Sequence, residues 1–417
     1  MNWILGASLS LLLAGCDEPQ AADTLVISSD PELRAMVSEL LPELAARSGL
    51  ELRRPVRLER RTREQLVSYL KAKLDEELPA EEERHMTRSY ALLGLVPEDL
   101  DLRGLLLSVY TEQVAGFYDP DSTALFVLAD QPTEALGTVL VHELVHAVQD
   151  QATDLDSITS KERGNDRQAA AQAAIEGHAT LVMLEYMMEK LQGAPVDLGE
   201  VEGFTRQLRP ALEAVRQQYP ALAEAPNVIQ EALLFPYLEG AGFVQRMWLE
   251  RAGRPAPLGE HLPLSTEQIL HPDRLGGEPD HPWDLALRVS GARVVFSDGL
   301  GELETRLMLE QVGVSDPALA ATGWDGDRFA LLEGSAGEAL VWVTVWDDVE
   351  ARDRFTASLT PHLDSLPSEA TLEVRDVGGV PAAILRVGEV PPIDVEVVEL
   401  GRGGASAPSG AGVPPPS

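Results

Sequence analysis

Hydrophobic and polar residues in the N-terminal part of the chain follow helical and strand spacings in turn. Between Asp30, which fits a helix N-cap, and Gly49, which fits a helix end, apolar residues recur at helical spacing. Residues 54–61 alternate in the manner of a strand, whereas residues 62–78 and 98–113 return to helical spacing. This part of the chain is therefore predicted to contain both helices and strands.

A β-hairpin followed by two long helices is predicted in the middle of the chain. Residues 113–130 contain two apolar runs on either side of Asp-Pro-Asp-Ser, a sequence rich in turn-forming residues. A helix of about five turns follows, with Leu136, Leu140 and Leu144 on one face. The next long helix, residues 167–192, is apolar on more than one side and is expected to be buried.

A second, smaller domain is predicted where the pattern changes. Strand, helix and hairpin spacings lie there at residues 339–348, 349–363 and 371–388. We expect an α+β fold with a mostly helical domain at residues 24–284, which includes an N-terminal α/β extension, and a small α+β domain at residues 285–400. Residues 401–417 are mainly Gly, Ser, Ala and Pro, which predicts a disordered tail.

The charge of the chain excludes one class of partner. The sequence has 68 acidic and 33 basic residues, a formal net charge of -35. Such a surface repels phosphate backbones, so nucleic acid is not an expected partner. The simplest interpretation of the acidity is a well-solvated surface, and the sequence does not indicate an oligomeric state.

The only cysteine of the chain, Cys16, predicts export and a lipid anchor. It ends "LLLAGC" after an apolar run that is too short to cross a bilayer, which fits a signal peptide at residues 1–15. The small residues before Cys16 resemble the lipobox of bacterial lipoproteins, so we expect lipidation at Cys16 and a short polar tether at residues 16–23. A plain cleaved signal and a buried helix are the alternatives, since this start has no Lys or Arg. The implied location is the bacterial cell envelope, at a membrane that the sequence does not specify.

Candidate chemistry is concentrated in "VHELVH", residues 141–146. On a helix, His142 and His146 lie on one face and can both bind one metal ion. Glu143 lies about 100° around the helix from His142, where a general base can reach a water at the metal. The pattern also arises by chance, but here apolar residues surround it, and buried polar side chains need partners.

A catalytic zinc site takes three protein ligands, so a third is needed. The pattern HExxHxxGxxH, which supplies a third histidine on the same stretch of sequence, is absent, because Gln149 and Ala152 stand where it has Gly and His. Glu176 and His178 lie on the second long helix and point about 200° apart, so only one can face the ion. A carboxylate lowers the charge of the site more than a third histidine does, which favours Glu176. Gly177 is expected to let the two long helices pack closely.

The chain resembles the gluzincin class of zinc metallopeptidases. "VHELVHAVQDQ" followed by "AAIEGHATLV" is similar to the arrangement in which HExxH on one helix is completed by Glu on the next. "EQVAGFYDP", "HELVHAVQDQ", "IEGHAT", "STEQILHP" and "GWDGDR" together resemble a group of uncharacterised bacterial secreted or lipid-anchored proteins with metallopeptidase motifs, over about residues 85 to 350.

The resemblance implies a zincin-like domain in which the hairpin before the HExxH helix aligns a peptide or protein substrate. It implies Zn²⁺ held by His142, His146 and Glu176, with Glu143 as the general base of peptide hydrolysis. Thr180 stands where an acidic residue often orients a histidine, which leaves Asp150 as a candidate for that role, although it also fits a solvated helix end.

Two further residues are candidates for stabilising the transition state. His271 in "ILHP" and Tyr237 in "FPYLEG" can each donate a hydrogen bond to an oxyanion, although such residues beside Pro more commonly have structural roles.

Two other functions stay open. One is a non-catalytic envelope protein with a structural zinc or a peptide- or glycan-binding role, and the other is a zinc amidase that acts on peptidoglycan.

Overall fold

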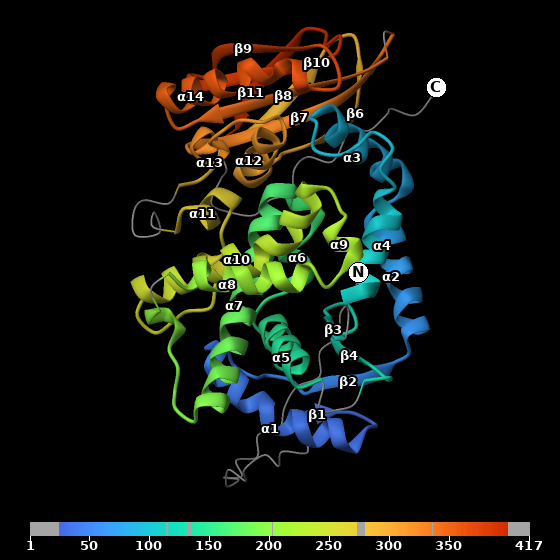
Figure 1. Ribbon diagram of the computed structural model, residues 1–417, viewed down its shortest axis with the longest axis vertical. Coiled ribbons are helices and arrows are strands. Elements are labelled where there is room, and N and C mark those ends of the chain that lie inside the picture. The colour runs from blue at the N-terminus through green and yellow to red at the C-terminus, as the bar shows by residue number, and fades with distance from the viewer. Residues whose placement is uncertain are drawn as a thin grey trace, which may run out of the picture.

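The computed structural model shows an α+β protein with a helical body and a β-rich region at one end (Figure 1). It describes residues 25–398 except 114–115, 132–135, 202, 273–279 and 336. The α+β class predicted from the sequence is confirmed. The predicted signal peptide, the lipidation site Cys16, the tether and the C-terminal tail lie outside the described residues.

Most of the N-terminal elements form where the hydrophobic spacing predicts them. They are β1 (Val26–Ile27), α1 (Pro31–Ser48), β2 (Val56–Arg61), α2 (Arg63–Glu77), α3 (Ala80–Leu92) and α4 (Leu102–Gln113). Asp30 caps α1 by accepting hydrogen bonds from two backbone N–H groups, and Gly49 ends the helix in the left-handed conformation, as predicted. The sequence analysis did not identify α3, which begins after Pro79 without a capping side chain.

A mixed sheet beside α5 (Gly137–Ala152) contains the predicted hairpin. Its strand order is β1-β2-β4-β3, in which β4 is Ala124–Leu128 and β3 is Gly116–Asp119. The strands β1, β2 and β4 are parallel, whereas β3 runs antiparallel to β4 and forms one edge of the sheet. This edge strand, β3, contacts α5, the helix that carries the HExxH sequence (Figure 1).

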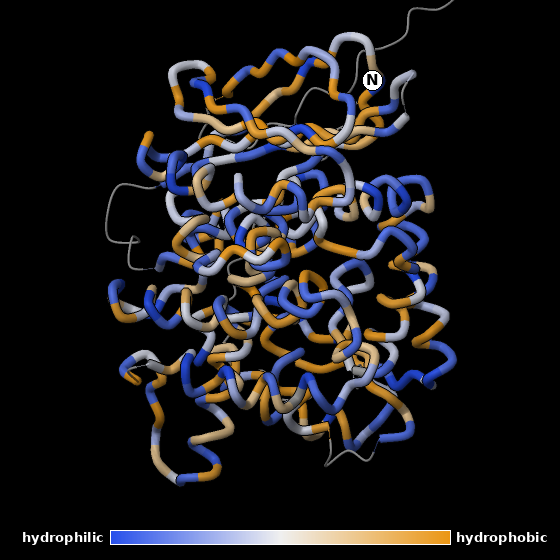
Figure 2. The backbone as a smooth tube through the Cα atoms, turned by 45° about the horizontal axis from the view of Figure 1, so that its top comes forward, coloured by the Kyte–Doolittle hydropathy of each residue, from blue (hydrophilic) through white to orange (hydrophobic). Residues whose placement is uncertain are grey.

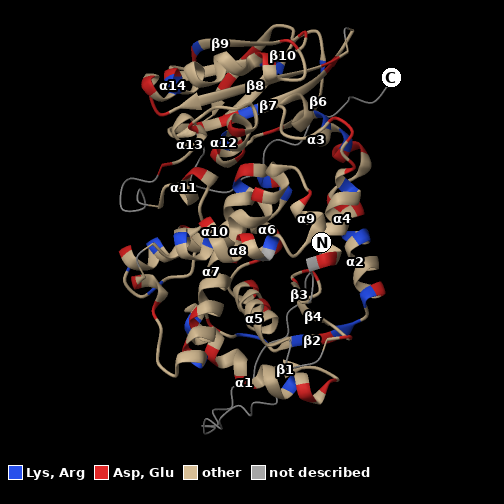
Figure 3. Ribbon diagram, viewed as in Figure 1, with Lys and Arg blue, Asp and Glu red and all other residues tan. Residues whose placement is uncertain are grey.

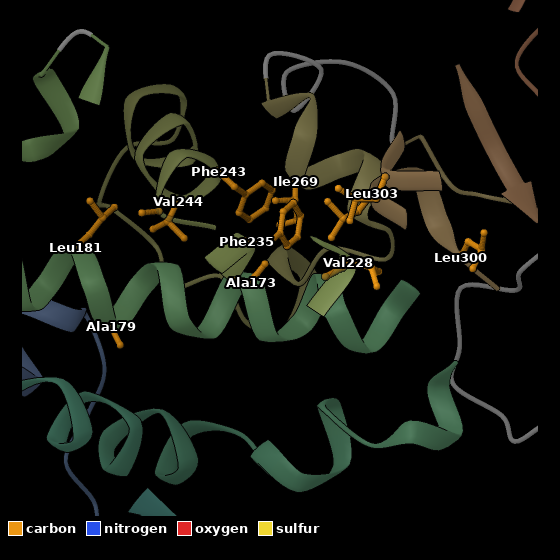
Figure 4. Close-up of a cluster of buried hydrophobic side chains, with 14 of the residues drawn as sticks. Ala173, Ala179, Leu181, Val228, Phe235, Phe243, Val244, Ile269, Leu300 and Leu303 are labelled. Carbon is orange, nitrogen blue, oxygen red and sulfur yellow. The ribbon is translucent and has the colours of Figure 1, made fainter. Parts of the chain in front are cut away.

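The helix α7 (Asn165–Gln192) is the centre of the helical body. It packs against α5 on one side and against α10 (Asn227–Glu250) on another, where Ala173, Phe235 and Phe243 meet in a buried cluster (Figure 4). Gly177 was expected to allow close packing with α5, but it faces α10 instead. A Cβ atom at Gly177 would collide with the backbone of Gly240, so the close contact that requires this glycine is the one between α7 and α10.

Shorter helices complete the body: α6 (Leu155–Ile158), α8 (Phe204–Arg216), α9 (Pro220–Ala223) and α11 (Thr266–Leu270). The stretch between α5 and α7 is rich in polar residues. It contains the short helix α6 because the Asp154 side chain accepts a hydrogen bond from the backbone of Ser157 and caps a single turn.

The C-terminal region is built on a five-stranded antiparallel sheet of order β6-β7-β8-β10-β9. The bounds of these strands are Arg293–Asp298, Trp324–Gly334, Gly337–Trp346, Val380–Val387 and Ala370–Val377. A separate pair is formed by β5 (Asp284–Val289) and β11 (Ile393–Val398). The helices are α12 (Gly301–Gln311), α13 (Pro317–Ala321) and α14 (Val349–Leu359). The predicted strand, helix and hairpin of this region are confirmed.

The main hydrophobic core continues across the boundary that was predicted near residue 284. Buried residues of one cluster include Leu41 in α1, Leu144 in α5 and Trp342 in β8. Polar contacts cross the same boundary, since the hydroxyl of Tyr90 in α3 donates to Glu304 in α12 at 2.6 Å. The five-stranded sheet is thus held against the helical body by packing and hydrogen bonds.

Hydrophobic and charged residues are mixed along the described part of the chain (Figure 2 and Figure 3). Hydrophobic and hydrophilic positions alternate along the backbone in Figure 2, and none of the described helices is long and apolar enough to span a membrane. Acidic and basic residues are interspersed along the outer helices and the sheet (Figure 3).

Candidate metal centre

The helix α5 carries the HExxH sequence on a largely buried framework. Leu136, Leu140 and Leu144 are each at most 1% exposed, so the predicted apolar face is the one that packs into the core. The same helical spacing places His142 and His146 together on the other side of the helix, with ring centroids 4.7 Å apart. The local sequence therefore dictates both the helix and the pairing of its two histidines.

The structure brings His142, His146 and Glu176 to one point. The Nε2 atoms of the two histidines are 3.0 Å apart, and the Oε2 atom of Glu176 lies 2.9 Å from Nε2 of His142 and 3.4 Å from Nε2 of His146. Ligands that surround one zinc ion tetrahedrally at roughly 2.1 Å are separated by about 3.4 Å. Two imidazoles and a carboxylate at these separations fit a zinc site.

The charges at this cluster favour a bound cation. Burial opposes ionisation of Glu176, but the adjacent imidazoles of His146 and His142 hold its pKa well below the ordinary value. Burial likewise disfavours the charged form of His146, yet the carboxylates of Glu176 and Glu143 outweigh it and raise the pKa of His146 to about 9. A partly buried pair of carboxyl groups beside two imidazoles thus stabilises positive charge at the point where the three ligand atoms meet.

Glu143 is held beside the cluster by the edge strand. Its Oε2 atom accepts a hydrogen bond of 2.8 Å from the backbone N–H of Tyr118 in β3. Burial raises the pKa of Glu143, the charge of Glu176 adds to this, and the two histidines oppose it. A raised pKa brings a carboxylate closer to the range in which it both accepts and returns protons, as a general base requires.

Gln149 orients His146, a role that the sequence analysis did not assign. Its Oε1 atom lies 2.8 Å from Nδ1 of His146, and its Nε2 group donates to the carbonyl of Ile175 and contacts Nδ1 of His178, each at 3.0 Å. Because Gln149 follows His146 by three positions on a helix, their side chains are neighbours, and this spacing is the signal that identifies the pair.

His178 lies behind the cluster, as the angle between it and Glu176 on the helix predicted. Its ring packs edge-on against Trp248 with centroids 5.9 Å apart. Burial lowers the pKa of His178 to about 3, so the ring is neutral at physiological pH. It contacts Gln149 and is not among the three side chains whose ligand atoms converge.

Replacement of Gln149 with Leu is expected to weaken zinc binding by about ten- to a hundredfold. The substitution removes the partner of His146 Nδ1, and loss of such a partner typically costs this much in metal affinity. Competition titration with a zinc chelator measures the change. An unchanged affinity in a folded Gln149→Leu protein would show that this contact does not support the site.

The prediction that Asp150 orients a histidine is not supported by its contacts. Its Oδ2 atom accepts a hydrogen bond of 2.8 Å from the hydroxyl of Tyr118 and lies 3.9 Å from the guanidinium of Arg54. On the helix, Asp150 follows His146 by four positions but points to the hairpin. Asp150 therefore fixes β3 against α5, and Gln149 contacts the histidine.

The two candidate oxyanion donors lie in different places. The ring of Tyr237 in α10 is 6.0 Å from that of His142, and the charge of Glu176, followed by burial, raises the pKa of Tyr237 well above its ordinary value. Its hydroxyl thus stays protonated beside the cluster. His271, at the end of α11, instead lies 2.8 Å from the carboxylate of Glu302 in α12, so its contacts do not support its assignment to the site.

In comparisons with known proteins, only the C-terminal region of the chain gives a match. A family model described as a domain of unknown function, DUF8575, matches residues 289–384, which extend from the end of β5 into β10. Searches of curated proteins and of solved structures gave no match. The matched region does not include α5 or α7, so the interpretation of the metal centre rests on its geometry and on the resemblance of its motifs.

Proposed function

We propose that this protein is a zinc metallopeptidase of the gluzincin type with a zincin-like helical domain. The observation that carries the proposal is the convergence of His142, His146 and Glu176, with Glu143 held at their edge. These three side chains would hold Zn²⁺. When bound, the ion would supply Lewis-acid chemistry, which polarises a carbonyl group and makes water more acidic.

The residues of the chain have distinct tasks in this proposal. Glu143 accepts the proton of the attacking water and delivers it to the amine that leaves, so the peptide C–N bond is hydrolysed with no net change at the carboxylate. The outer edge of β3, which pairs with no other described strand, offers backbone groups to an extended peptide, and the bond from the Tyr118 N–H to Glu143 places this edge next to the proposed base. A protein or peptide is therefore the proposed substrate.

The position of Glu143 favours catalysis over a purely structural zinc site. A structural site has four protein ligands, whereas three converge here among the described residues, and a carboxylate lies beside them without completing the set. Hydrolysis of a peptidoglycan amide requires the same groups. The extended edge of β3 favours a peptide chain as the substrate.

Replacement of Tyr237 with Phe is expected to lower kcat by about a hundredfold while zinc affinity changes little. The proposed hydroxyl donor to the oxyanion is lost, and removal of one such donor typically has this effect, whereas the ligands remain. Steady-state kinetics on a quenched fluorescent peptide, with zinc content measured in parallel, tests it. A higher KM with an unchanged kcat would contradict this role and assign Tyr237 to substrate binding.

We propose in addition that the protein is exported and anchored in the cell envelope by lipid at Cys16. Replacement of Cys16 with Ser is expected to prevent incorporation of a fatty-acid analogue, because a hydroxyl group cannot form the thioether. Metabolic labelling of both proteins in a bacterial host measures this, and label retained in the Ser variant would refute lipidation at this residue.

A further inference from the structure

A cavity of about 460 Å³ lies between α2 and the mixed sheet. Aromatic rings of Tyr69, Phe117 and Phe126 line it together with Leu66, and the remaining lining residues are polar: Arg61, Glu64, Gln65 and Ser68. The Tyr69 and Phe117 rings are stacked with centroids 5.1 Å apart, and Phe117 and Phe126 are 5.3 Å apart. The cavity thus has an aromatic wall built from a helix and two neighbouring strands.

This cavity and the metal centre lie on opposite faces of one strand. The Tyr118 side chain reaches Asp150 on α5, and successive side chains of a strand point to opposite faces, so Phe117 points away from α5. Figure 1 shows the hairpin between α5 on one side and α2 on the other. Phe117 in the cavity and Tyr118, whose N–H holds Glu143, are consecutive residues.

A peptide that extends along the free edge of β3 would bring one side chain to this cavity. Cross-strand neighbours lie on the same face of a sheet, roughly 5 Å apart, so the peptide residue opposite Phe117 faces the aromatic rings. The neighbouring peptide residue faces α5 and Glu143. The side chain in the cavity therefore belongs to a residue close to the bond that would be hydrolysed.

The lining favours an apolar occupant over a charged one. Arg61, at the edge of the cavity, already pairs with Glu59 at 2.8 Å, and its guanidinium lies 4.7 Å from the centre of the Phe126 ring. The hydroxyl of Tyr69 is bonded to Asp119 at 2.6 Å. The ring edges, and the ring faces that neither the Tyr69–Phe117 stack nor Arg61 covers, can contact a ligand, and aromatic side chains pack well in offset or edge-on arrangements with such rings.

We propose that this cavity is the subsite that selects a large apolar side chain, preferably aromatic, next to the scissile bond of an extended peptide. The proposal rests on the proposed peptidase function and adds the class of substrate. It assigns α2 a part in specificity, although α2 carries no residue of the metal centre.

Selectivity can be tested on the zinc-loaded protein with a peptide library and mass spectrometry of the cleavage sites. Phe, Tyr or Trp is expected to be enriched at one position within two residues of the cut. Ser68 is an exposed residue of α2 that lines the cavity, so Ser68→Trp should fill it without disturbing the core. The ratio of kcat/KM for a peptide with Phe to that for the same peptide with Ala is then expected to fall at least about tenfold.

Ala72→Trp is the matched control, because Ala72 is also exposed on α2, one turn further along, and does not line the cavity. This variant should keep the parent ratio. Cleavage without aromatic enrichment, or an equal ratio in Ser68→Trp and the parent, would overturn the assignment of the cavity and leave the peptidase proposal intact.

A binding measurement separates the cavity from catalysis. Fluorine NMR of N-acetyl-para-fluorophenylalanine amide with the Glu143→Gln protein does not depend on turnover. Line broadening is expected, and adding Ser68→Trp but not Ala72→Trp should remove it. If the zinc-loaded parent cleaves no peptide but the broadening still depends on Ser68, the peptidase proposal is refuted and the cavity is supported as a site for an apolar side chain. Absence of both binding and cleavage would refute both.

Discussion

Glu143→Gln should reduce peptide hydrolysis by at least about a hundredfold while zinc stays bound. Gln has nearly the shape of Glu and can fill the same space between α5 and β3, but it cannot accept the proton of the attacking water. The ligands His142, His146 and Glu176 are untouched. Hydrolysis of a quenched fluorescent peptide, measured at equal zinc content in the parent and the variant, gives the ratio.

Glu98→Gln is a suitable control for this experiment, since Glu98 is an exposed residue of the turn between α3 and α4 and pairs with Arg88. Its activity should equal that of the parent. Activity of the Glu143→Gln protein within a few-fold of the parent would contradict the assignment of the general base. Loss of zinc together with activity would instead mean that Glu143 has a structural part in the metal centre.

Glu176→Ala is expected to weaken zinc binding more than about a hundredfold, whereas His178→Ala should weaken it less than about tenfold. Glu176 places a carboxylate oxygen 2.9 Å from Nε2 of His142, so its removal deletes a ligand. His178 contacts only Gln149 in this network, and Gln149 retains its bond to the Ile175 carbonyl when the ring is removed. Competition titrations of the two folded proteins measure both affinities.

His178 is fully buried, so its truncation also leaves space in the core. His178→Phe preserves most of the volume and is the second variant for this comparison, with thermal unfolding of both metal-free proteins as the check on folding. If the ranking is reversed, with the His178 variants losing zinc and Glu176→Ala retaining it, the third ligand is His178 and the gluzincin assignment fails.

The sequence predicts the elements whose signals are local. Asp30 and Gly49 mark both ends of α1 because capping depends on a few adjacent residues, and the positions of His142 and His146 follow from helical spacing alone. Charge reasoning and the family resemblance selected Glu176, and the structure places its carboxylate at the two histidines. These inferences need no knowledge of how distant elements pack.

Contacts between distant elements were the part that sequence reasoning did not supply. Tyr118 holds Glu143 through a backbone N–H, a group that every residue except proline possesses, so no side-chain pattern indicates it. The partner of Gly177 depends on which helix lies against α7, and the structure chooses α10. His271 was assigned to the site from its motif, but the packing of α11 on α12 joins it to Glu302.

The central claim, that His142, His146 and Glu176 hold zinc, is tested most directly by elemental analysis. Inductively coupled plasma mass spectrometry of the purified full chain gives the metal content per molecule, with His142→Ala as the site variant and His362→Ala, in the C-terminal region, as the histidine control. We expect about one zinc per chain in the parent and in His362→Ala, and none in His142→Ala. No zinc in the parent, or equal zinc in all three folded proteins, would contradict it.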